Sequence, residues 1–409
     1  METLAVYLND IMVGRLDDEN GELSFSYDTD YIETSQGEPL SYALPLRQEV
    51  YEHGEIEPFL SNLLPDDIIR TRIGEILGIP RDNTFAFLKA IGGDCAGSVA
   101  FYPEGSGPGR IVANTYRELS DGEASRILDN LEQRPLDVGE EGFRISGAGA
   151  QDKLIACVRN GKVFLPLNGT PSTDIIKIAL RNYPGSVENE WFCMNLALAC
   201  GLNAAECEII SFGGKRCYVC HRYDRENIDG SVHRLHQEDF CQMLKIDPKH
   251  KYETLGGPGI AESFGLLRNL SLPASDTVEF LDRLIFNFIV GNGDAHGKNM
   301  SVLYRNGLAE LAPMYDVMST AIYPEVGRRM AMKIDDEYNF KWITAGKFVR
   351  MGAKIGIAES VVRRELEKMS HRALSKLPHL VRSATRHHPS FCYAEIAKGI
   401  ERRIAQLLR

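Results

Sequence analysis

The chain has 409 residues, of which 44% are apolar and 25% charged, and its formal net charge is −11 at pH 7. These values are typical of a soluble globular protein and exclude a disordered, collagen-like or membrane-embedded chain. No apolar run reaches the roughly 18 to 20 residues of a membrane helix, and the N-terminus does not resemble a signal peptide, so no membrane association and a cytoplasmic location are expected. Because one core rarely serves so long a chain, we expect two or three subdomains.

The first 104 residues predict a small α+β unit. The alternating segments LAVYLND and MVGRL predict two strands joined by a turn, and a helix is expected from Asp66 to Leu77. The run GSGPGR, from Gly105 to Arg110, interrupts these patterns because glycine and proline disfavour both helix and strand. We therefore expect a first subdomain at residues 1–104.

The next part of the chain, 105–225, predicts a β-rich lobe. A helix is expected from Ser120 to Leu131, and strands are expected at LIACV, VFLPL, DIIKIA, CEIISF and RCYVCHRY. Between these strands, VENEWFCMNLALACGL predicts a long helix with one apolar side. That side is expected to consist of Val187, Trp191, Met194 and Leu198.

Residues 226–409 have a mostly helical pattern, so an all-helical C-terminal lobe is expected. The end of this lobe is basic, because residues 347–409 contain 14 Lys and Arg against 5 Asp and Glu. Such a helical tail suits nucleic acid or an acidic partner, and a solvated helix face explains the same charge equally well.

The nine cysteines are an odd number in a chain without a secretory signal, which indicates free thiols in a reducing compartment. Cys217 and Cys220 form the one CxxC motif. They lie in an expected strand, where positions three apart face opposite sides, and no second CxxC completes a four-thiolate zinc site. Buried structural thiols are therefore favoured over a metal or redox site.

Phosphoryl transfer requires metal ligands, cations against the phosphates, and a carboxylate that orients or deprotonates the attacking hydroxyl. In FIVGNGDAHGKNMSVLY, Asp294 and Asn299 have the spacing of the catalytic aspartate and metal-binding asparagine of protein kinases. Asp316 follows 22 residues after Asp294, close to the separation expected of the magnesium-binding aspartate. Val317 and Met318 replace the usual Phe-Gly after it, which puts a Phe-controlled switch in doubt but not metal binding.

Upstream, Lys177 ends the expected strand DIIKIA, where a lysine can reach the α- and β-phosphates. Glu188 or Glu190 on the following helix could pair with it, and we favour Glu190. Each feature alone has a simpler explanation: a chance Asp-x4-Asn, a solvated lysine, or an aspartate that caps a helix. Because they occur together in kinase order, the sequence predicts a kinase that uses ATP and Mg²⁺.

The segment SGAGAQDK, from Ser146 to Lys153, is rich in glycine and alanine. It is not a Walker loop, because no Gly-Lys-Ser or Gly-Lys-Thr closes it, and Asp152 breaks the GxGxxG pattern. It lies between a loop and a strand, where the glycine loop of a kinase covers the nucleotide. Small residues there let backbone amides approach phosphate oxygens.

Taken together, these motifs resemble the HipA family, the kinase toxins of bacterial HipBA toxin–antitoxin modules, over essentially the whole chain. SNLLPDD resembles a segment of the family's N-terminal subdomain, and SGAGAQDK fits its SxxGAQxK loop. IIK, YDR, QEDFCQ, GGPGI, GDAHGKN and MYD then follow in family order. The resemblance implies an α+β, bilobal protein-kinase-like fold: an extra α+β subdomain at 1–104, the remaining β-rich N-lobe at 105–225, and a helical C-lobe at 226–409.

The resemblance also implies roles for particular residues. Asp294 is expected to be the catalytic base and Asn299 and Asp316 the magnesium ligands. Lys177 is expected to bind the phosphates, and Ser146 to be autophosphorylated. The remaining nucleotide contacts are expected from Gly147, Gly149, Ala150, Gln151, Lys153, His221, Tyr223, Gln237 and Tyr315.

His221 departs from the acidic residue expected beside the adenine. Backbone contacts to the base would survive this change, whereas a side-chain contact to the ribose would not.

The activity implied by the resemblance is phosphorylation of a serine in a protein, glutamyl-tRNA synthetase in the best-known examples, which stalls translation and growth and promotes persistence. The implied partner is a small DNA-binding antitoxin, HipB-like, that caps the kinase and represses the shared operon. The basic tail could touch operator DNA in that complex. Two alternatives remain: a small-molecule kinase for sugars or aminoglycosides, against which the N-terminal unit and the SxxGAQxK loop speak, and an inactive ATP-binding partner of a repressor, against which the filled catalytic positions speak.

Overall fold

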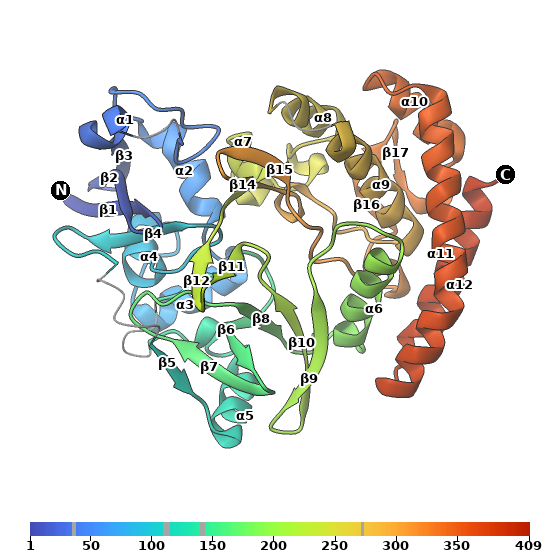
Figure 1. Ribbon diagram of the computed structural model, residues 1–409, viewed down its shortest axis with the longest axis horizontal. Helices are drawn as coiled ribbons and strands as arrows, with labels where there is room; N and C mark the ends of the chain where they lie inside the picture. The colour runs from blue at the N-terminus through green and yellow to red at the C-terminus, as the bar shows by residue number, and fades with distance from the viewer. Residues whose placement is uncertain (35–37, 109–114, 140–143, 271–273) are drawn as a thin grey trace.

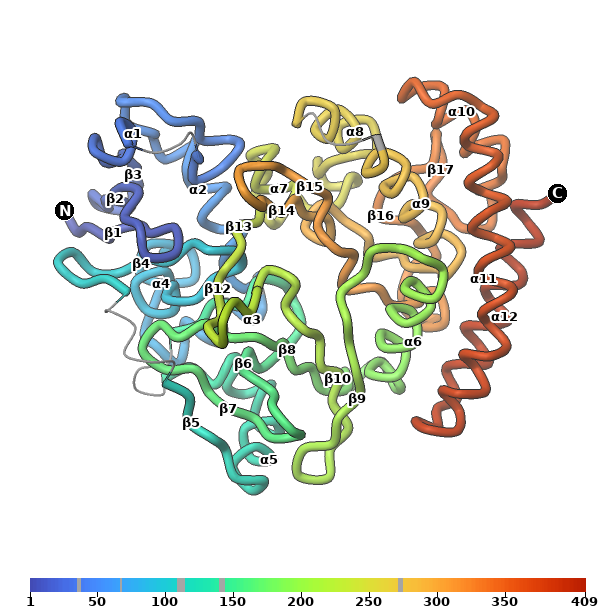
Figure 2. The backbone as a smooth tube through the Cα atoms, in the orientation of Figure 1, coloured from blue at the N-terminus to red at the C-terminus, as the bar shows by residue number. Residues whose placement is uncertain are grey.

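The computed structural model describes residues 1–34, 38–108, 115–139, 144–270 and 274–409. The last residues of the predicted breaker GSGPGR lie outside the described residues. In the described part, the chain runs from an N-terminal sheet through a six-stranded sheet to a group of helices, with the two termini at opposite sides (Figures 1 and 2). None of the helices in these ranges is long and apolar enough to cross a membrane.

The N-terminal unit is an antiparallel sheet in the order β3-β2-β1-β4 with four helices beside it (Figure 1). Leu23, Phe25 and Tyr27 alternate with more exposed residues, so one face of β3 enters the core as a half-buried strand requires. The helix predicted from Asp66 is present, and Gly78, with φ +68°, ends it. The elements of this unit are β1 Glu2–Leu8, β2 Ile11–Glu19, β3 Glu22–Tyr27, α1 Thr29–Thr34, α2 His53–Asn62, α3 Asp67–Leu77, α4 Thr84–Ile91 and β4 Val99–Pro103.

The second sheet is also antiparallel and has the order β5-β7-β6-β8-β10-β9. The predicted helix after Ser120 is present, and the Ser120 side chain caps it. The long helix α6 is present, but its apolar side differs from the prediction because Leu198 is exposed. The elements are β5 Tyr116–Glu118, α5 Asp121–Asn130, β6 Lys153–Arg159, β7 Lys162–Pro166, β8 Asp174–Lys177, α6 Ser186–Ala199, β9 Cys207–Phe212 and β10 Lys215–His221.

The C-terminal part is mainly helical, and α11 and α12 run along its outer side (Figure 1). Its helices are α7 Phe240–Met243, α8 Ile260–Asn269, α9 Ala274–Val290, α10 Ala345–Lys354, α11 Glu359–His387 and α12 Cys392–Leu407. Its strands are β11 Arg225–Ile228, β12 Ser231–Arg234, β13 His236–Asp239, β14 Ser301–Arg305, β15 Leu308–Leu311, β16 Arg329–Ile334 and β17 Glu337–Asn339.

The mixed α and β composition agrees with the predicted fold class, but the prediction that the C-lobe is all-helical was wrong in detail. Two hairpins in it turn on Asp229–Gly230 and Asn306–Gly307, where both residues have positive φ. Asp-Gly and Asn-Gly favour such turns because they adopt positive φ at low cost. These dipeptides were a signal in the sequence for β11, β12, β14 and β15, which the sequence analysis missed.

Two apolar cores fill the described molecule. One joins the N-terminal sheet to the six-stranded sheet, and the other surrounds α6, α9, α11 and α12. Cys217 belongs to the first core and Cys220 to the second, so the two thiols of the CxxC motif face opposite sides of β10, as predicted. The subdomain boundaries at residues 104 and 225 stay predictions.

Candidate active site

A cleft of about 680 Å³ opens between the six-stranded sheet, the segment that joins α2 to α3, and the C-terminal part. Its walls contain every residue that the sequence analysis proposed for catalysis or nucleotide binding, although these residues come from segments up to 170 positions apart. The structure therefore brings together Ser146, Gly147, Gly149, Ala150, Gln151, Lys153, Lys177, His221, Tyr223, Gln237, Asp294, Asn299, Tyr315 and Asp316.

Lys177, at the end of β8, joins two acidic residues in the cleft. Its Nζ atom donates to Glu190 Oε1 at 2.7 Å and to Asp316 Oδ1 at 2.6 Å. The pairing with Glu190 agrees with the preference stated above, since Glu188 pairs with Arg216 instead. Lys177 thus joins α6 to the segment that carries the expected metal-binding aspartate.

The three groups influence each other's ionisation. Burial opposes the charge on Lys177, yet the Asp316 and Glu190 carboxylates raise the pKa of this lysine. Burial also opposes ionisation of Asp316, but the Lys177 ammonium prevails and lowers the pKa of Asp316 to about 2. For Glu190 burial prevails and raises the pKa to about 7. Asp316 is accordingly the firmly ionised carboxylate of the site, as a metal ligand needs to be.

The segment after α9 contains the residues that are expected to form a catalytic loop. The Asp294 amide donates to Asn292 Oδ1 at 3.0 Å, and the Asn299 side chain donates to the Asp294 carbonyl at 2.7 Å. The Asp294 side chain is 46% exposed, which leaves its carboxylate open to the cleft. The phenol of Tyr252, which the sequence analysis did not single out, donates to Asp294 Oδ1.

The N-terminal unit also contributes to the site, which the sequence analysis did not foresee. Lys298 is buried beside Asn299, and its Nζ donates to the carbonyl and the side-chain oxygen of Asn62, both at 2.9 Å. Lys251 forms an ion pair of 2.5 Å with Asp66. SNLLPDD and GDAHGKN were both visible as motifs, but no local pattern in the sequence indicates that they meet.

The glycine-rich loop lies against the same N-terminal segment. Ser146 is buried, and its hydroxyl donates to the Leu63 carbonyl at 2.6 Å. The Asp66 amide donates to the Gly149 carbonyl at 3.1 Å. A Cβ at residue 147 would lie 2.8 Å from the terminal methyl groups of Ile155 and Leu136, so a larger residue here would displace the ends of these side chains.

The connecting segment after β10 carries the residues expected near the adenine. Tyr223 donates to Gln237, and its ring lies 5.6 Å from the ring of Tyr315. His221 Nδ1 lies 2.6 Å from Asp174, and this hydrogen bond raises the pKa of the imidazole despite partial burial. A carboxylate is thus present near His221 even though residue 221 itself is not acidic.

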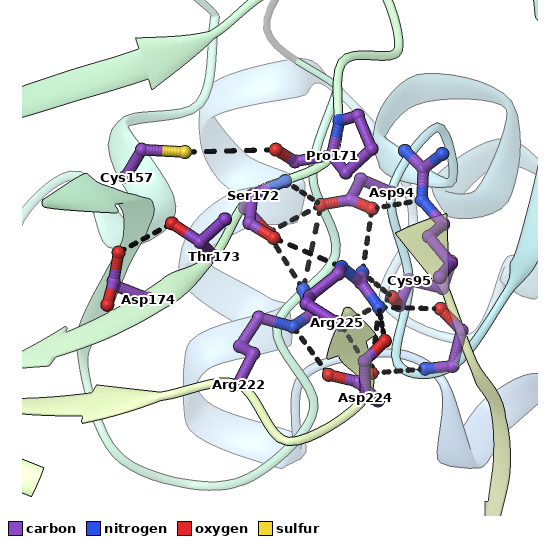
Figure 3. Close-up of polar contacts among 12 residues, drawn as sticks. Asp94, Cys95, Cys157, Pro171, Ser172, Thr173, Asp174, Arg222, Asp224 and Arg225 are labelled. Carbon is purple, nitrogen blue, oxygen red and sulfur yellow. Dashed lines mark hydrogen bonds and ion pairs between the residues drawn. The ribbon is translucent and has the colours of Figure 1, made fainter. Parts of the chain in front are cut away.

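A buried ionic cluster lies behind this segment (Figure 3). The Asp94 carboxylate contacts three guanidinium groups, and Ser172 donates to it at 2.6 Å. The Asp94 carbonyl also accepts the Ser146 amide at 3.0 Å, so the cluster and the glycine-rich loop share one residue. The three guanidinium groups belong to Arg222, Arg225 and Arg234.

The cleft fits a nucleotide triphosphate with a divalent cation. Burial, reinforced by the nearby Lys177 ammonium, lowers the pKa of Lys153 to about 8, and phosphate groups beside this lysine would stabilise its charged form. Asn299 and Asp316 would hold the cation through oxygen atoms. Two such protein ligands suit Mg²⁺, which completes its coordination with water and phosphate.

A two-part fold with a lysine–glutamate pair, an Asp-x4-Asn loop and a separate acidic residue in one cleft defines the class of protein-kinase-like phosphotransferases. The model of the HipA-like C-terminal domain matches residues 145–377, and that of the HipA N-terminal domain matches residues 4–102. The chain therefore belongs to the HipA family of serine/threonine kinases. The resemblance inferred from the motifs is confirmed.

Relatives support the same assignment. The serine/threonine-protein kinase toxin HipA of Shewanella oneidensis is 33% identical over 386 residues, which cover 90% of this chain and 87% of the relative. The protein Y4mE of Sinorhizobium fredii is 39% identical over 90% of this chain and 89% of its own length. A chain in the solved complex of Shewanella oneidensis HipA, HipB and operator DNA has a TM-score of 0.85 and 28% identity, covering 99% of this chain and 97% of that one. This likeness confirms the predicted fold class.

Proposed function

We propose that this kinase is the toxin of a toxin–antitoxin module and transfers phosphate from ATP to serine residues of proteins. The observation that carries the proposal is the meeting of Asp294, Asp316 and the Lys177–Glu190 pair in one cleft. The acceptor protein expected from the resemblance is glutamyl-tRNA synthetase, whose modification would stop translation and growth.

Each catalytic group has a distinct task in this proposal. The exposed Asp294 carboxylate orients the acceptor hydroxyl and receives its proton. Lys177, steadied by Glu190, binds phosphate oxygens, while Asn299 and Asp316 hold Mg²⁺. When bound, Mg²⁺ neutralises charge on the phosphate oxygens.

Autophosphorylation of Ser146 is proposed to switch the enzyme off. The Ser146 hydroxyl is buried against the Leu63 carbonyl, so the loop has to leave this position before the serine can meet a catalytic aspartate. A phosphate adds roughly −1.5 to −2 charges beside the expected triphosphate site, so the modified loop should stay out. Phosphopeptide mapping after incubation with ATP and Mg²⁺ should find the phosphate on Ser146, and the phosphorylated fraction should bind ATP weakly.

A HipB-like DNA-binding antitoxin is the proposed partner, because the solved relative is named as a complex with HipB and operator DNA. The long helix α11 supports a contact with DNA phosphates in such a complex, since Lys and Arg outnumber Glu among its exposed charged residues. These exposed basic residues are Arg363, Arg364, Arg372, Lys376, Arg382 and Arg386.

The decisive experiment substitutes Asp294→Asn, which keeps the size of the side chain but removes the base. Label transfer from γ-labelled ATP to protein should be lost, whereas ATP affinity should change by less than about tenfold, because Asp294 acts on the hydroxyl and not on the nucleotide. Expression of the wild type should arrest growth and expression of the variant should not. The matched control is Asp336→Asn, which alters an exposed aspartate outside the cleft.

Retained label transfer in Asp294→Asn would overturn the assignment of the base. Label found on small alcohols and not on protein would favour a small-molecule kinase. Equal toxicity of both variants would show that growth arrest does not come from phosphorylation.

A further inference from the structure

The Tyr252 phenol donates a hydrogen bond to Oδ1 of Asp294, the expected catalytic base. We propose that Tyr252 is a positioning residue that fixes the orientation of the Asp294 carboxylate for reaction with the acceptor hydroxyl. This inference rests on the proposed function of Asp294 and extends it to a residue that the kinase motifs do not contain.

The backbone around Tyr252 is firmly held. The Tyr252 carbonyl accepts the amides of Leu255 and Gly257, both at 2.9 Å, which closes a tight turn. The Lys251 carbonyl accepts the amide of Gly297 in the catalytic loop at 3.2 Å. A Cβ at residue 257 would lie 2.3 Å from the His250 carbonyl oxygen, so the turn depends on this glycine.

Ion pairs attach the residues on both sides of Tyr252 to different parts of the molecule. Lys251 pairs with Asp66 of the N-terminal unit at 2.5 Å. Glu253 pairs with the Lys333 side chain at 3.0 Å and also accepts the Lys333 amide at 2.7 Å. The backbone that carries Tyr252 is therefore held in place on both sides.

The phenol ring is fixed as well. It meets the buried His296 ring edge to face, with the ring centres 4.9 Å apart. Burial and the neighbouring Asp294 carboxylate raise the pKa of Tyr252, so the phenol keeps its proton and remains a donor. Its hydrogen bond to a charged acceptor belongs to the stronger class of hydrogen bonds.

The main chain and the side chain of Asp294 are held by different groups. Asn292 and Asn299 bind the main chain. In the described part of the chain, the Tyr252 phenol donates a hydrogen bond to the carboxylate, whereas the nearby His296 Nε2 lies 3.9 Å away, beyond hydrogen-bond distance. Without the phenol, the half-exposed carboxylate would rotate among several orientations.

A carboxylate has two oxygens and accepts several hydrogen bonds. With Oδ1 bound to Tyr252, Oδ2 remains for the acceptor hydroxyl and its proton. Tyr252 thereby decides which oxygen serves as the base. Because a small misplacement of a catalytic group can cost a large part of the rate, this selection should appear in kcat.

The test is Tyr252→Phe, which keeps the ring against His296 and removes only the hydroxyl. The readout is the initial rate at which γ-labelled ATP labels the chain itself and added glutamyl-tRNA synthetase with its tRNA. We expect kcat to fall by about tenfold, as loss of one hydrogen bond to a charged group implies, with the KM for ATP changed less than about twofold. Tyr7→Phe, which removes a phenol of the N-terminal sheet, is the matched control and should change neither value.

A second measurement tests the contact itself. The melting temperatures of Tyr252→Phe, Asp294→Asn and the double variant should be non-additive, because both single changes remove or weaken the same hydrogen bond. Additive shifts would overturn the contact. A purely structural role would raise KM and lower kcat together, and would also overturn the proposal.

Two further outcomes count against it. Unchanged kcat in Tyr252→Phe would show that Asp294 orients itself, and increased kcat would show that Tyr252 competes with the acceptor hydroxyl. Either result leaves the kinase assignment intact if Asp294→Asn is inactive. Activity that persists in Asp294→Asn would instead remove the basis of both proposals.

Discussion

Two buried lysines face the cleft from neighbouring strands, because Lys153 and Lys177 are direct partners in the pairing of β6 with β8. They differ in their hydrogen-bond partners. Lys177 is held by two carboxylates, whereas the Lys153 Nζ donates to the Ala148 carbonyl of the glycine-rich loop. Burial and the Lys177 charge lower the pKa of Lys153 to about 8. Of the two lysines, Lys153 is therefore the one whose charged form is destabilised by folding.

Lys153→Met is therefore predicted to stabilise the nucleotide-free protein while weakening ATP binding. At pH 7 the free energy of unfolding should rise by about 1 to 3 kcal/mol, because a costly buried charge is replaced by an apolar chain of similar length. ATP affinity should fall by about tenfold or more. Denaturant titrations with and without ATP measure both effects, and Lys162→Met, at an exposed lysine, is the control.

The pH dependence of the stability of the wild type and of Lys153→Met tests the direction of this pKa shift. Between pH 8 and the ordinary pKa of lysine near 10.5, the unfolded chain binds more protons at residue 153 than the folded chain does. Stability therefore rises with pH in this window for the wild type, and the methionine variant should lack that gain. An equal rise in both proteins would contradict the lowered pKa.

At this scale the local patterns of the sequence indicated side chains that lie in one cleft, but not the groups that hold those side chains in place, and the catalytic roles stay predictions. The Asp-x4-Asn spacing and the strand lysine are local patterns, and the residues they indicate do meet in the cleft. Tyr252 and Asn62 act through contacts with loops 42 and 236 positions away, and such contacts leave no periodic or spacing signal. The family motifs indicated which segments matter, but not which of these segments contact each other.

At the scale of elements, the buried ionic cluster links a turn of the N-terminal unit to β11 and β12 (Figure 3). Burial opposes ionisation of Asp94, but the guanidinium groups of Arg225, Arg234 and Arg222 hold the pKa of Asp94 well below its usual range. A carboxyl group with a depressed pKa contributes stability above its unfolded pKa near 3.8. That contribution is lost only in strong acid.

Asp94→Ala is predicted to destabilise the protein by about 3 to 5 kcal/mol, because it leaves three buried guanidinium groups without their shared carboxylate. Urea denaturation at pH 7 measures the loss, with Asp10→Ala in an exposed turn as control. ATP affinity should fall as well, because loss of the carboxylate loosens the turn whose Asp94 carbonyl holds Ser146, and the cluster borders the connecting segment. A loss below about 1 kcal/mol would mean that water replaces the carboxylate at little cost.

Elements were predictable where amphipathic or alternating patterns were long, as for α3, α5 and α6. The short strands β13, β14 and β15 were not, because four or five residues carry too little periodicity to compete with a helical interpretation. Their pairing places Gln237 and Asp239 opposite Leu303 and Ser301, next to the catalytic loop. The missed strands are thus part of what positions the site.

At the scale of the whole molecule, several buried polar contacts fasten the N-terminal unit to the C-terminal part, and two of them lie beside the predicted catalytic loop and on β13. One is the Lys298–Asn62 contact beside the catalytic loop. The other is Glu238 on β13, whose carboxylate accepts the Ser41 hydroxyl, and at 2.9 Å the Tyr42 amide and the Tyr304 phenol. We expect the unit to remain attached during turnover, because each contact would leave buried groups unpaired if it opened.

The Glu238 contact makes this attachment sensitive to pH. Burial outweighs the three hydrogen bonds and raises the pKa of Glu238 to about 7, so between pH 4.5 and 7 the folded protein binds a proton that the unfolded chain does not. Stability contributed by residue 238 should therefore fall as pH rises through this window, by up to about 3 kcal/mol.

Glu238→Gln mimics the protonated carboxyl group and should remove this dependence. The free energy of unfolding of the variant should exceed that of the wild type at pH 8 and approach it at pH 5, because wild-type Glu238 is then itself protonated. Denaturant titrations at the two pH values measure the difference, and Glu367→Gln, at an exposed position of α11, corrects for the general effect of removing one negative charge. A variant less stable than the wild type at pH 8 would show that Glu238 is ionised in the folded protein, and that the three donors hold the N-terminal unit through a charged acceptor.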